Sequence, residues 1–271
     1  EALLELWLAV GRRGGKSQIA ALVAVYDAAF KDYTDRLAPG EVATVMVIAQ
    51  DRKQARNVMR YITGLLHSNP MMEQLILREQ QESIELTNRT VIEVQSASFR
   101  SVRGYTVACV IADEIAFWRS DESANPDKEI INALRPAMAT LGGKLIALSS
   151  PYAKRGALWD TYRRHYGKPG NILIAQADTR TMNPIIPERV IDEAMKRDPE
   201  AARAEYMAEF RSDLETFLVR EVVDAAVRSG PLELPFDRKH RYFGFTDPAG
   251  GSSDEFTLAV GHKEGDVTVI D

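Results

Sequence analysis

A glycine-rich segment near the start of the 271-residue sequence constrains the fold more than any other feature. Residues 11–17 read Gly-Arg-Arg-Gly-Gly-Lys-Ser, between an apolar run and a segment with helical spacing. Small residues let backbone N–H groups point at an anion, Lys16 can reach β- and γ-phosphates, and Ser17 can bind Mg²⁺. The start of the helix adds its positive dipole end. The alternative is an ordinary glycine-rich turn, and Val10 stands where the usual phosphate-binding motif has its first glycine.

This pattern, between a strand and a helix, predicts a phosphate-binding loop. The residues expected to contact nucleotide are Gly11, Arg13, Gly14, Gly15, Lys16 and Ser17.

Apolar runs alternate with helical segments through the first part of the chain. The expected strands are 4–10, 42–49, 107–112, 144–148 and 172–177, with a hairpin formed by 84–86 and 91–94. One helix is expected after Ser17, and a second follows the strand at 42–49 and ends at about His67. Two more are expected over 128–140 and 157–166. Strands that are apolar throughout and alternate with helices indicate an α/β fold, with a parallel sheet covered on both faces.

The pattern changes after residue 186. Two helices broken near Asp198-Pro199 are expected over 187–210, and another over 219–228. From Arg241 the apolar period falls to two, which predicts a three-stranded meander over 241–246, 256–261 and 267–270. We therefore predict three parts: a nucleotide-binding domain over 1–212, a helical linker over 213–237 and the start of a second domain over 238–271.

An acidic pair follows the strand at 107–112. Asp113 is expected to hold Mg²⁺ through its water shell, and Glu114 to polarise the attacking water. Many strands end in solvated carboxylates, but this pair comes about 90 residues after a phosphate-binding loop in the same sheet. No Asn/Thr-Lys-x-Asp segment is present to recognise guanine, so ATP is favoured over GTP. Ser149 and Ser150 end the next strand, where they either sense the γ-phosphate or form a simple turn.

Together these residues resemble the large terminase subunit family, the motors that package viral DNA into procapsids. The resemblance rests on motifs that occur in the family's order across nearly the whole chain. They are residues 11–17, Arg103-Gly104, Asp113-Glu114, Ser149-Ser150-Pro151-Tyr152, Gly156-Ala157-Leu158-Trp159, Asn183-Pro184, Ala204-Glu205-Tyr206, Glu209-Phe210 and Thr246-Asp247-Pro248-Ala249-Gly250-Gly251.

The resemblance implies a P-loop ATPase domain followed by an RNase H-like nuclease, of which 238–271 is the N-terminal part. Arg103 matches an arginine finger offered by a neighbouring subunit, and Arg12 matches one proposed to act in cis. The plainer interpretations are a salt bridge for Arg103 and a phosphate contact for Arg12. Asp247 matches the first metal-binding aspartate of the nuclease, which uses Mg²⁺ or Mn²⁺. Because two-metal cleavage needs several carboxylates, the remaining ligands are expected beyond Asp271, and we predict no nuclease activity for this chain.

The resemblance also implies partners and a location. These are double-stranded DNA, a homo-oligomeric ring on a portal protein, a small terminase subunit and the host cell cytoplasm. Two other functions share the motifs: a helicase or recombination-type DNA-dependent ATPase, and a non-catalytic nucleotide-gated DNA-binding or assembly module. Glu114 distinguishes these functions, because a non-catalytic nucleotide-gated module has no need for a carboxylate at this position.

Charge and composition restrict the remaining possibilities. With 34 Lys and Arg against 39 Asp and Glu, the net charge of −5 argues against one wide basic DNA-binding face. Basic groups around Arg60 and Arg163 are expected on solvated surface or against phosphate. Cys109 is the only cysteine, which excludes an intrachain disulfide and a cysteine-rich zinc site. No apolar run approaches the length of a membrane helix, and the four histidines show no spacing typical of a metal site.

Overall fold

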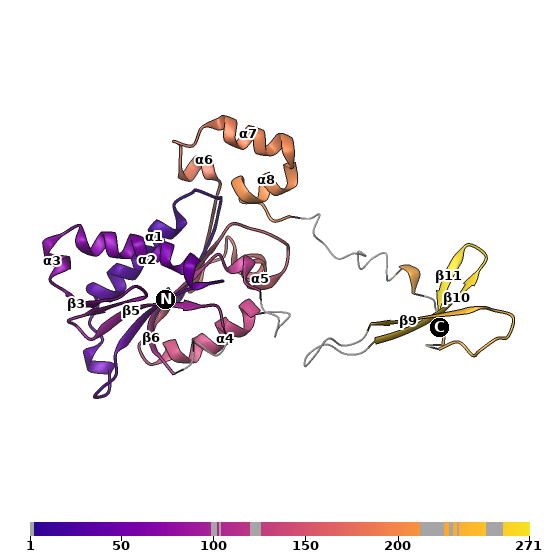
Figure 1. Cartoon of the computed structure of the whole chain (residues 1–271), viewed down its shortest axis with the longest axis horizontal. Helices are drawn as coiled ribbons and strands as arrows, with labels where there is room; N and C mark the ends of the chain where they lie inside the picture. The colour runs from indigo at the N-terminus through magenta and orange to yellow at the C-terminus, as the bar shows by residue number, and fades with distance from the viewer. Residues whose placement is uncertain are drawn as a thin grey trace. The chain divides into compact units, whose positions relative to one another are not determined.

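The computed structural model describes most of the chain. It covers residues 3–98, 102, 104–119, 126–211, 225–227, 230–231, 233–247 and 257–271. The chain divides into two compact units near residue 215 (Figure 1).

The first unit is built on an eight-stranded sheet. Its strands, in spatial order, are β3 (Ile76–Glu79), β4 (Ser83–Leu86), β5 (Thr90–Ser96), β2 (Ala43–Ala49), β6 (Thr106–Asp113), β7 (Lys144–Ser149), β1 (Glu5–Val10) and β8 (Ile172–Ala177). The six strands from β5 to β8 pair in parallel, which confirms the predicted parallel sheet. The predicted hairpin is the antiparallel pair β4–β5, and β3, which the sequence did not predict, extends it at the sheet edge.

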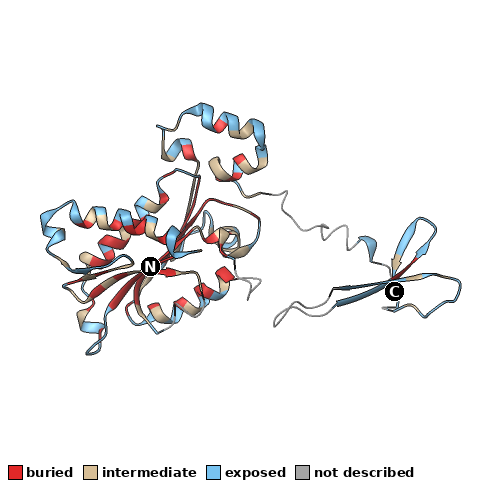
Figure 2. Ribbon diagram, in the orientation of Figure 1, coloured by how far each residue is buried: buried red, intermediate tan, exposed pale blue. Residues whose placement is uncertain are grey.

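Helices cover both faces of this sheet. On one face lie α1 (Lys16–Ala29) and α2 (Arg52–His67), and on the other α4 (Pro126–Ala139) and α5 (Gly156–His165). Alternate residues of β2 serve the two faces: Val45 and Val47 pack with the first pair of helices, and Met46 and Ile48 with the second. Figure 2 shows the buried residues concentrated on the sheet and on the helix surfaces that face it. The connections include a short helix α3 (Pro70–Glu73) and two 3₁₀ turns, Thr34–Arg36 and Ile115–Phe117.

The face of α1 that packs on the sheet consists of small residues. Ala20, Ala24 and Ala28 are fully buried. Most of the large apolar residues whose spacing predicted this helix lie on its exposed side, where Leu22 is 58% exposed and Phe30 is 66% exposed, although Val23 packs against the core. Small buried residues allow the helix axis to lie close to the sheet. The helix was therefore predicted correctly from residues that mostly lie outside its packing face.

A helical segment follows β8. It contains α6 (Thr179–Met182), α7 (Glu188–Arg197) and α8 (Pro199–Tyr206). The predicted break at Asp198-Pro199 is confirmed: Asp198 accepts a hydrogen bond from the backbone N–H of Ala201 and caps α8. Most of the helix predicted over 219–228 lies outside the described residues. Within the described part of the chain, no helix is both long enough and apolar enough to cross a lipid bilayer.

The second unit contains the predicted three-stranded meander. Its strands are β9 (Tyr242–Asp247), β10 (Thr257–Glu264) and β11 (Val267–Ile270), antiparallel in the order β11-β10-β9.

Alanine substitutions at two glycines test how closely the first unit is packed. A Cβ atom at Gly143, before β7, would lie 2.5 Å from the carbonyl oxygen of Val107, so we expect Gly143→Ala to lower the free energy of unfolding by about 1–3 kcal/mol. Gly64 lies on α2 with open space around it, so Gly64→Ala is the matched control and is expected to raise stability by about 0.5–1 kcal/mol. Urea midpoints measure both changes. Equal effects of the two variants would contradict the close approach at Gly143.

Candidate nucleotide-binding site

The glycine-rich loop connects the end of β1 to the start of α1. A Cβ atom at Gly11 would lie 2.7 Å from the carbonyl oxygen of Tyr206, so this position accepts only glycine without rearrangement. Gly15 adopts the left-handed conformation, with φ 78°, immediately before the first turn of α1. Glycine adopts this conformation without steric cost. The loop and the helix N-terminus together form the anion-binding arrangement that the sequence predicted.

The helical segment after β8 fixes the loop from behind. Thr179 Oγ1 donates a hydrogen bond to the carbonyl oxygen of Arg12 at 2.8 Å, and Asn183 Nδ2 donates to that of Arg13 at 2.9 Å. The guanidinium of Arg12 contacts both carboxylate oxygens of Glu205, at 3.0 and 3.1 Å. Two carbonyl groups of the loop are thereby engaged by side chains of this segment.

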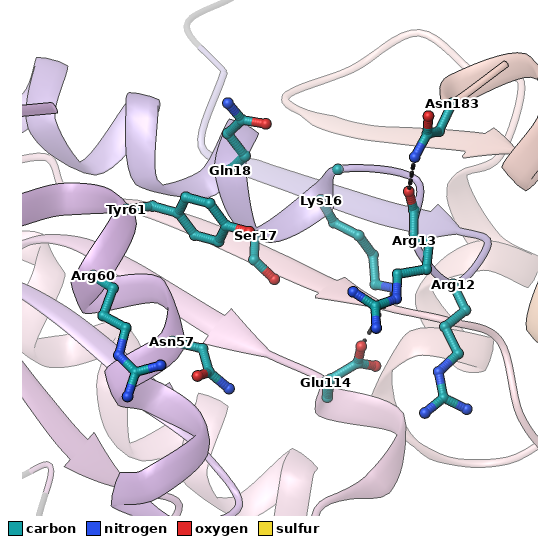
Figure 3. Close-up of a pocket in the computed structure, with 11 residues that line it drawn as sticks. Arg12, Arg13, Lys16, Ser17, Gln18, Asn57, Arg60, Tyr61, Glu114 and Asn183 are labelled. Carbon is teal, nitrogen blue, oxygen red and sulfur yellow. Dashed lines mark hydrogen bonds and ion pairs between the residues drawn. The ribbon is translucent and has the colours of Figure 1, made fainter. Parts of the chain in front are cut away.

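Lys16 lies at the centre of the site. Its side chain is only 6% exposed. The Nζ atom donates to Ser150 Oγ at 3.0 Å and lies 3.3 Å from Glu114 Oε1 (Figure 3). An isolated buried ammonium group is strongly destabilising, so these oxygens are what makes its position tolerable.

Glu114 joins the ends of β6 and β7. Its second carboxylate oxygen accepts hydrogen bonds from Ser149 Oγ at 3.0 Å and from the backbone N–H of Ser150 at 3.3 Å. Its backbone is left-handed, with φ 50°, an unusual conformation for a non-glycine residue. Such strain at a charged residue is typical of functional sites.

Asp113 is buried beside this pair. Burial and the negative charge of Glu114 raise its pKa to about 7, against the opposing effect of Lys16. Its Oδ1 atom has no hydrogen-bond partner among the described residues. This buried carboxylate oxygen, unpaired within the described part of the chain, lies at the carboxyl ends of the strands, as the phosphate-binding loop does. Such a position fits the water shell of Mg²⁺. The donor set is therefore compatible with the predicted metal.

Lys16 and Glu114 face a cleft of about 770 Å³. Its wall is formed by Arg12, Arg13, Gly15, Lys16, Ser17, Gln18, Asn57, Arg60, Tyr61, Glu114 and Asn183 (Figure 3). Sequence reasoning gave no role to Asn57 and Tyr61 of α2. Their spacing relative to Arg60 places all three on one face of that helix, but nothing in the sequence says that this face meets the loop.

The other residues singled out in the sequence do not all lie at the cleft. Arg60 lines the cleft, whereas Arg52 and Arg56 of the same helix both pair with Glu82. Arg103 lies outside the described residues. Asp247 ends β9 in the second unit, and nothing further is described for its side chain.

The loop, its acidic strand and the sheet order define a P-loop domain. The family described as "Uncharacterized protein MJ0330, N-terminal P-loop domain" matches residues 1–208, and the chain belongs to this family. No curated protein gives a significant sequence match.

Solved structures of phage large terminases share the fold. The ATPase domain of the Thermus phage P74-26 large terminase has a TM-score of 0.61 and 16% identity, covering 78% of this chain and 90% of that one. The HK97 bacteriophage large terminase has a TM-score of 0.62 and 16% identity, covering 97% of this chain and 57% of that one. The large terminase of a thermophilic bacteriophage, solved in complex with ADP, has a TM-score of 0.58 and 11% identity, covering 97% and 61%. The chain thus has the terminase ATPase fold, and it spans about three fifths of the two whole terminases.

The raised pKa of Asp113 predicts a pH-dependent cost. The folded state keeps this proton up to about pH 7, whereas the unfolded chain loses it near its ordinary pKa of 3.8. Stability should therefore fall as pH rises from about 4 to 7, by up to about 4 kcal/mol from this group. In chelator-containing buffer we expect Asp113→Asn to be more stable than the wild type at pH 8, and the difference to shrink toward pH 4.

Chemical denaturation across this pH range measures the effect. Glu193→Gln removes an exposed carboxylate on α7 and is the control, with no such trend expected. A constant difference between Asp113→Asn and the wild type at all pH values would contradict the shift.

Proposed function

We propose that this chain is the ATP-hydrolysing part of a DNA-translocating motor of the large terminase type. One observation carries the proposal: Lys16 and Glu114 line one cleft beside a phosphate-binding loop, and the Ser149-Ser150 pair contacts both of them from behind. A loop that only bound phosphate would not need a carboxylate placed to activate water.

Each residue has a role in this proposal. The loop N–H groups and Lys16 bind the β- and γ-phosphates, and Lys16 exchanges Glu114 for phosphate oxygens when ATP enters. Glu114 is then released from Lys16 and orients the attacking water. Ser17 and Asp113 would hold Mg²⁺, which when bound neutralises phosphate charge. The terminase of the thermophilic bacteriophage, solved with ADP and with ATP-γ-S, supports a nucleotide ligand for this fold.

Ser149 and Ser150 are proposed to couple nucleotide state to β7. They contact the two groups that change partners when ATP binds, because Ser150 contacts Lys16 and Ser149 contacts Glu114. Breaking either contact changes the hydrogen bonds of a hydroxyl at the end of a central strand. The resulting movement of the segment that follows β7 would be the mechanical output.

The arginine finger is assigned to Arg103, offered in trans. Arg12 is the alternative in cis, but its guanidinium is held by both oxygens of Glu205. It would have to break this ion pair to reach phosphate. Arg12 is therefore proposed to fix the loop and to contact phosphate secondarily.

The proposed partners follow from the terminase comparison. They are double-stranded DNA, a homo-oligomeric ring on a portal protein and a small terminase subunit, in the host cell cytoplasm. Exposed basic residues on and after α5, including Arg163, Arg164 and Lys168, offer phosphate contacts. We further propose that 238–271 begins an RNase H-like nuclease, after a linker at 213–237. In that domain Asp247 would be one ligand of Mg²⁺ or Mn²⁺.

Steady-state hydrolysis tests the ATPase. We expect Lys16→Ala and Glu114→Gln each to lower kcat by about 100-fold or more, because one loses the phosphate contact and the other the base. Lys196→Ala, on the exposed end of α7, is the control and should leave kcat unchanged. Stimulation by double-stranded DNA would favour the motor over a silent nucleotide-gated module. Binding of ATP without hydrolysis, in the presence of DNA and at concentrations that assemble the ring, would contradict the proposal.

Mixing inactive subunits tests the arginine assignment. Arg103→Ala and Lys16→Ala chains should each be inactive alone. If Arg103 acts in trans, a Lys16→Ala neighbour supplies the missing arginine to an intact site, and an equimolar mixture should recover roughly a tenth or more of wild-type activity. A mixture of Arg12→Ala with Lys16→Ala is the comparison. It should not recover, because a neighbour cannot supply a residue that acts in cis; absence of recovery with Arg103→Ala would overturn the assignment.

A further inference from the structure

The second unit brings together three metal-binding side chains that are distant in sequence. His262 and Glu264 lie two residues apart on β10, so both point to the same side of the sheet. His240 precedes β9, and its ring centroid is 4.3 Å from that of His262. One ligand atom from each of the three side chains lies within 4.8 Å of the others. From this cluster we propose a binding site for a divalent transition metal ion, with Zn²⁺ as its natural occupant.

The orientation of His262 supports this proposal. Its side chain is only 3% exposed, and Nδ1 lies 2.8 Å from a carboxylate oxygen of Asp271. Histidine ligands commonly donate this second N–H to a carboxylate, which fixes the ring and leaves the other nitrogen free for the metal. The free nitrogen, Nε2, faces Glu264 Oε1 at 3.2 Å.

The separation of these two atoms suits a shared ion. Ligands at zinc bond lengths of about 2.0–2.1 Å in a tetrahedral shell lie about 3.3 Å apart. A lone pair on Nε2 and a carboxylate oxygen at this distance repel each other unless a cation or a proton lies between them. The competing state is therefore a protonated imidazole held between Asp271 and Glu264.

The ligand types select the metal. Two imidazoles and one carboxylate are typical of zinc and related transition metals, whereas Ca²⁺ and Mg²⁺ prefer oxygen ligands alone. His240 is half-buried and Glu264 is exposed, so an ion can enter from solvent. Three protein ligands leave a fourth tetrahedral position for water.

This site is separate from the metal position expected at Asp247. In the β9–β10 ladder His262 pairs with Tyr242, whereas Asp247 pairs with Thr257 at the opposite end. Five residues of strand separate them, about 16 Å. Spacing in the sequence does not reveal this cluster, because His240 and His262 are more than twenty residues apart and meet only through the β-meander.

A bound ion would connect the turn before β9 to β10. Most residues of β10 are exposed, so apolar burial contributes little to this unit in isolation. Metal binding to the folded state adds directly to its stability.

Cobalt titration tests the proposal. The tag-free 271-residue chain, freed of metal with chelator, is titrated with Co²⁺ and followed by its visible absorption, with Zn²⁺ as competitor. We expect one equivalent to bind with tetrahedral-type absorption and to be displaced by Zn²⁺. His240→Asn and Glu264→Gln should each weaken binding at least 10-fold, and Asp271→Asn about 10- to 100-fold through ring orientation.

Two controls separate this site from others. His67 also lies between two carboxylates, those of Glu73 and Glu79 at 3.0 and 2.8 Å, and it is therefore the matched control. Because His67 is not part of the proposed site, His67→Asn should leave cobalt binding unchanged. Lys16→Ala should bind cobalt normally, which keeps this test independent of the ATPase. Protection of β9 and β10 amides from hydrogen exchange should rise with Zn²⁺ in the wild type but not in His240→Asn. His240 is half-buried, so its replacement disturbs folding less than replacement of the buried His262 would.

Two results would overturn the site. One is a dissociation constant weaker than about 100 µM for the wild type, far from the affinity of structural zinc sites. The other is tight binding that survives both His240→Asn and Glu264→Gln. Either result would assign His262 to the protonated, doubly ion-paired state.

Discussion

The buried charge of Lys16 is the constraint on which the rest of the site depends. An ammonium group with 6% exposure needs anionic or polar partners, and here Glu114 and Ser150 supply them. Replacing those partners by phosphate requires no further desolvation of Lys16, because its ammonium group is already buried. In the proposed function, this geometry places a positive charge where the nucleotide phosphates would bind. It also keeps the carboxylate of Glu114 paired with Lys16 until a nucleotide binds.

The order of the strands brings these groups together. Neighbours β6, β7 and β1 form the middle of the parallel sheet, so their carboxyl ends lie side by side. In open α/β sheets, ligands bind at the carboxyl ends of the strands. Asp113, Ser149 and the glycine-rich loop each lie at the end of one of these strands, and a different order would separate them by the width of intervening strands. The fold thus explains why residues more than a hundred positions apart in the sequence lie close together at one end of the strands.

The helical segment after β8 adds a second set of contacts to the loop. Thr179, Asn183 and Glu205 hold its backbone and the guanidinium of Arg12. These bonds connect the segment directly to the loop. This gives the proposed motor a direct mechanical link, and it distinguishes the arrangement from a loop supported by the sheet alone. The second unit, with its separate histidine cluster, carries chemistry that does not depend on that link.

Local residue patterns predicted most of the elements and the local chemistry. Apolar period, turn residues and the Gly-Lys-Ser spacing depend on near neighbours, so the parallel strands, the phosphate-binding loop and the acidic pair were predictable, whereas the edge strand β3 was not. Tertiary structure alone decided which surfaces meet. It placed the alanines of α1 against the sheet and most of its large residues in solvent, moved Asn57 and Tyr61 into the cleft, paired Arg12 with Glu205, and brought His240 to His262. The physical reason is that hydrophobicity and spacing describe one segment at a time, whereas packing distance and strand order are properties of pairs of segments.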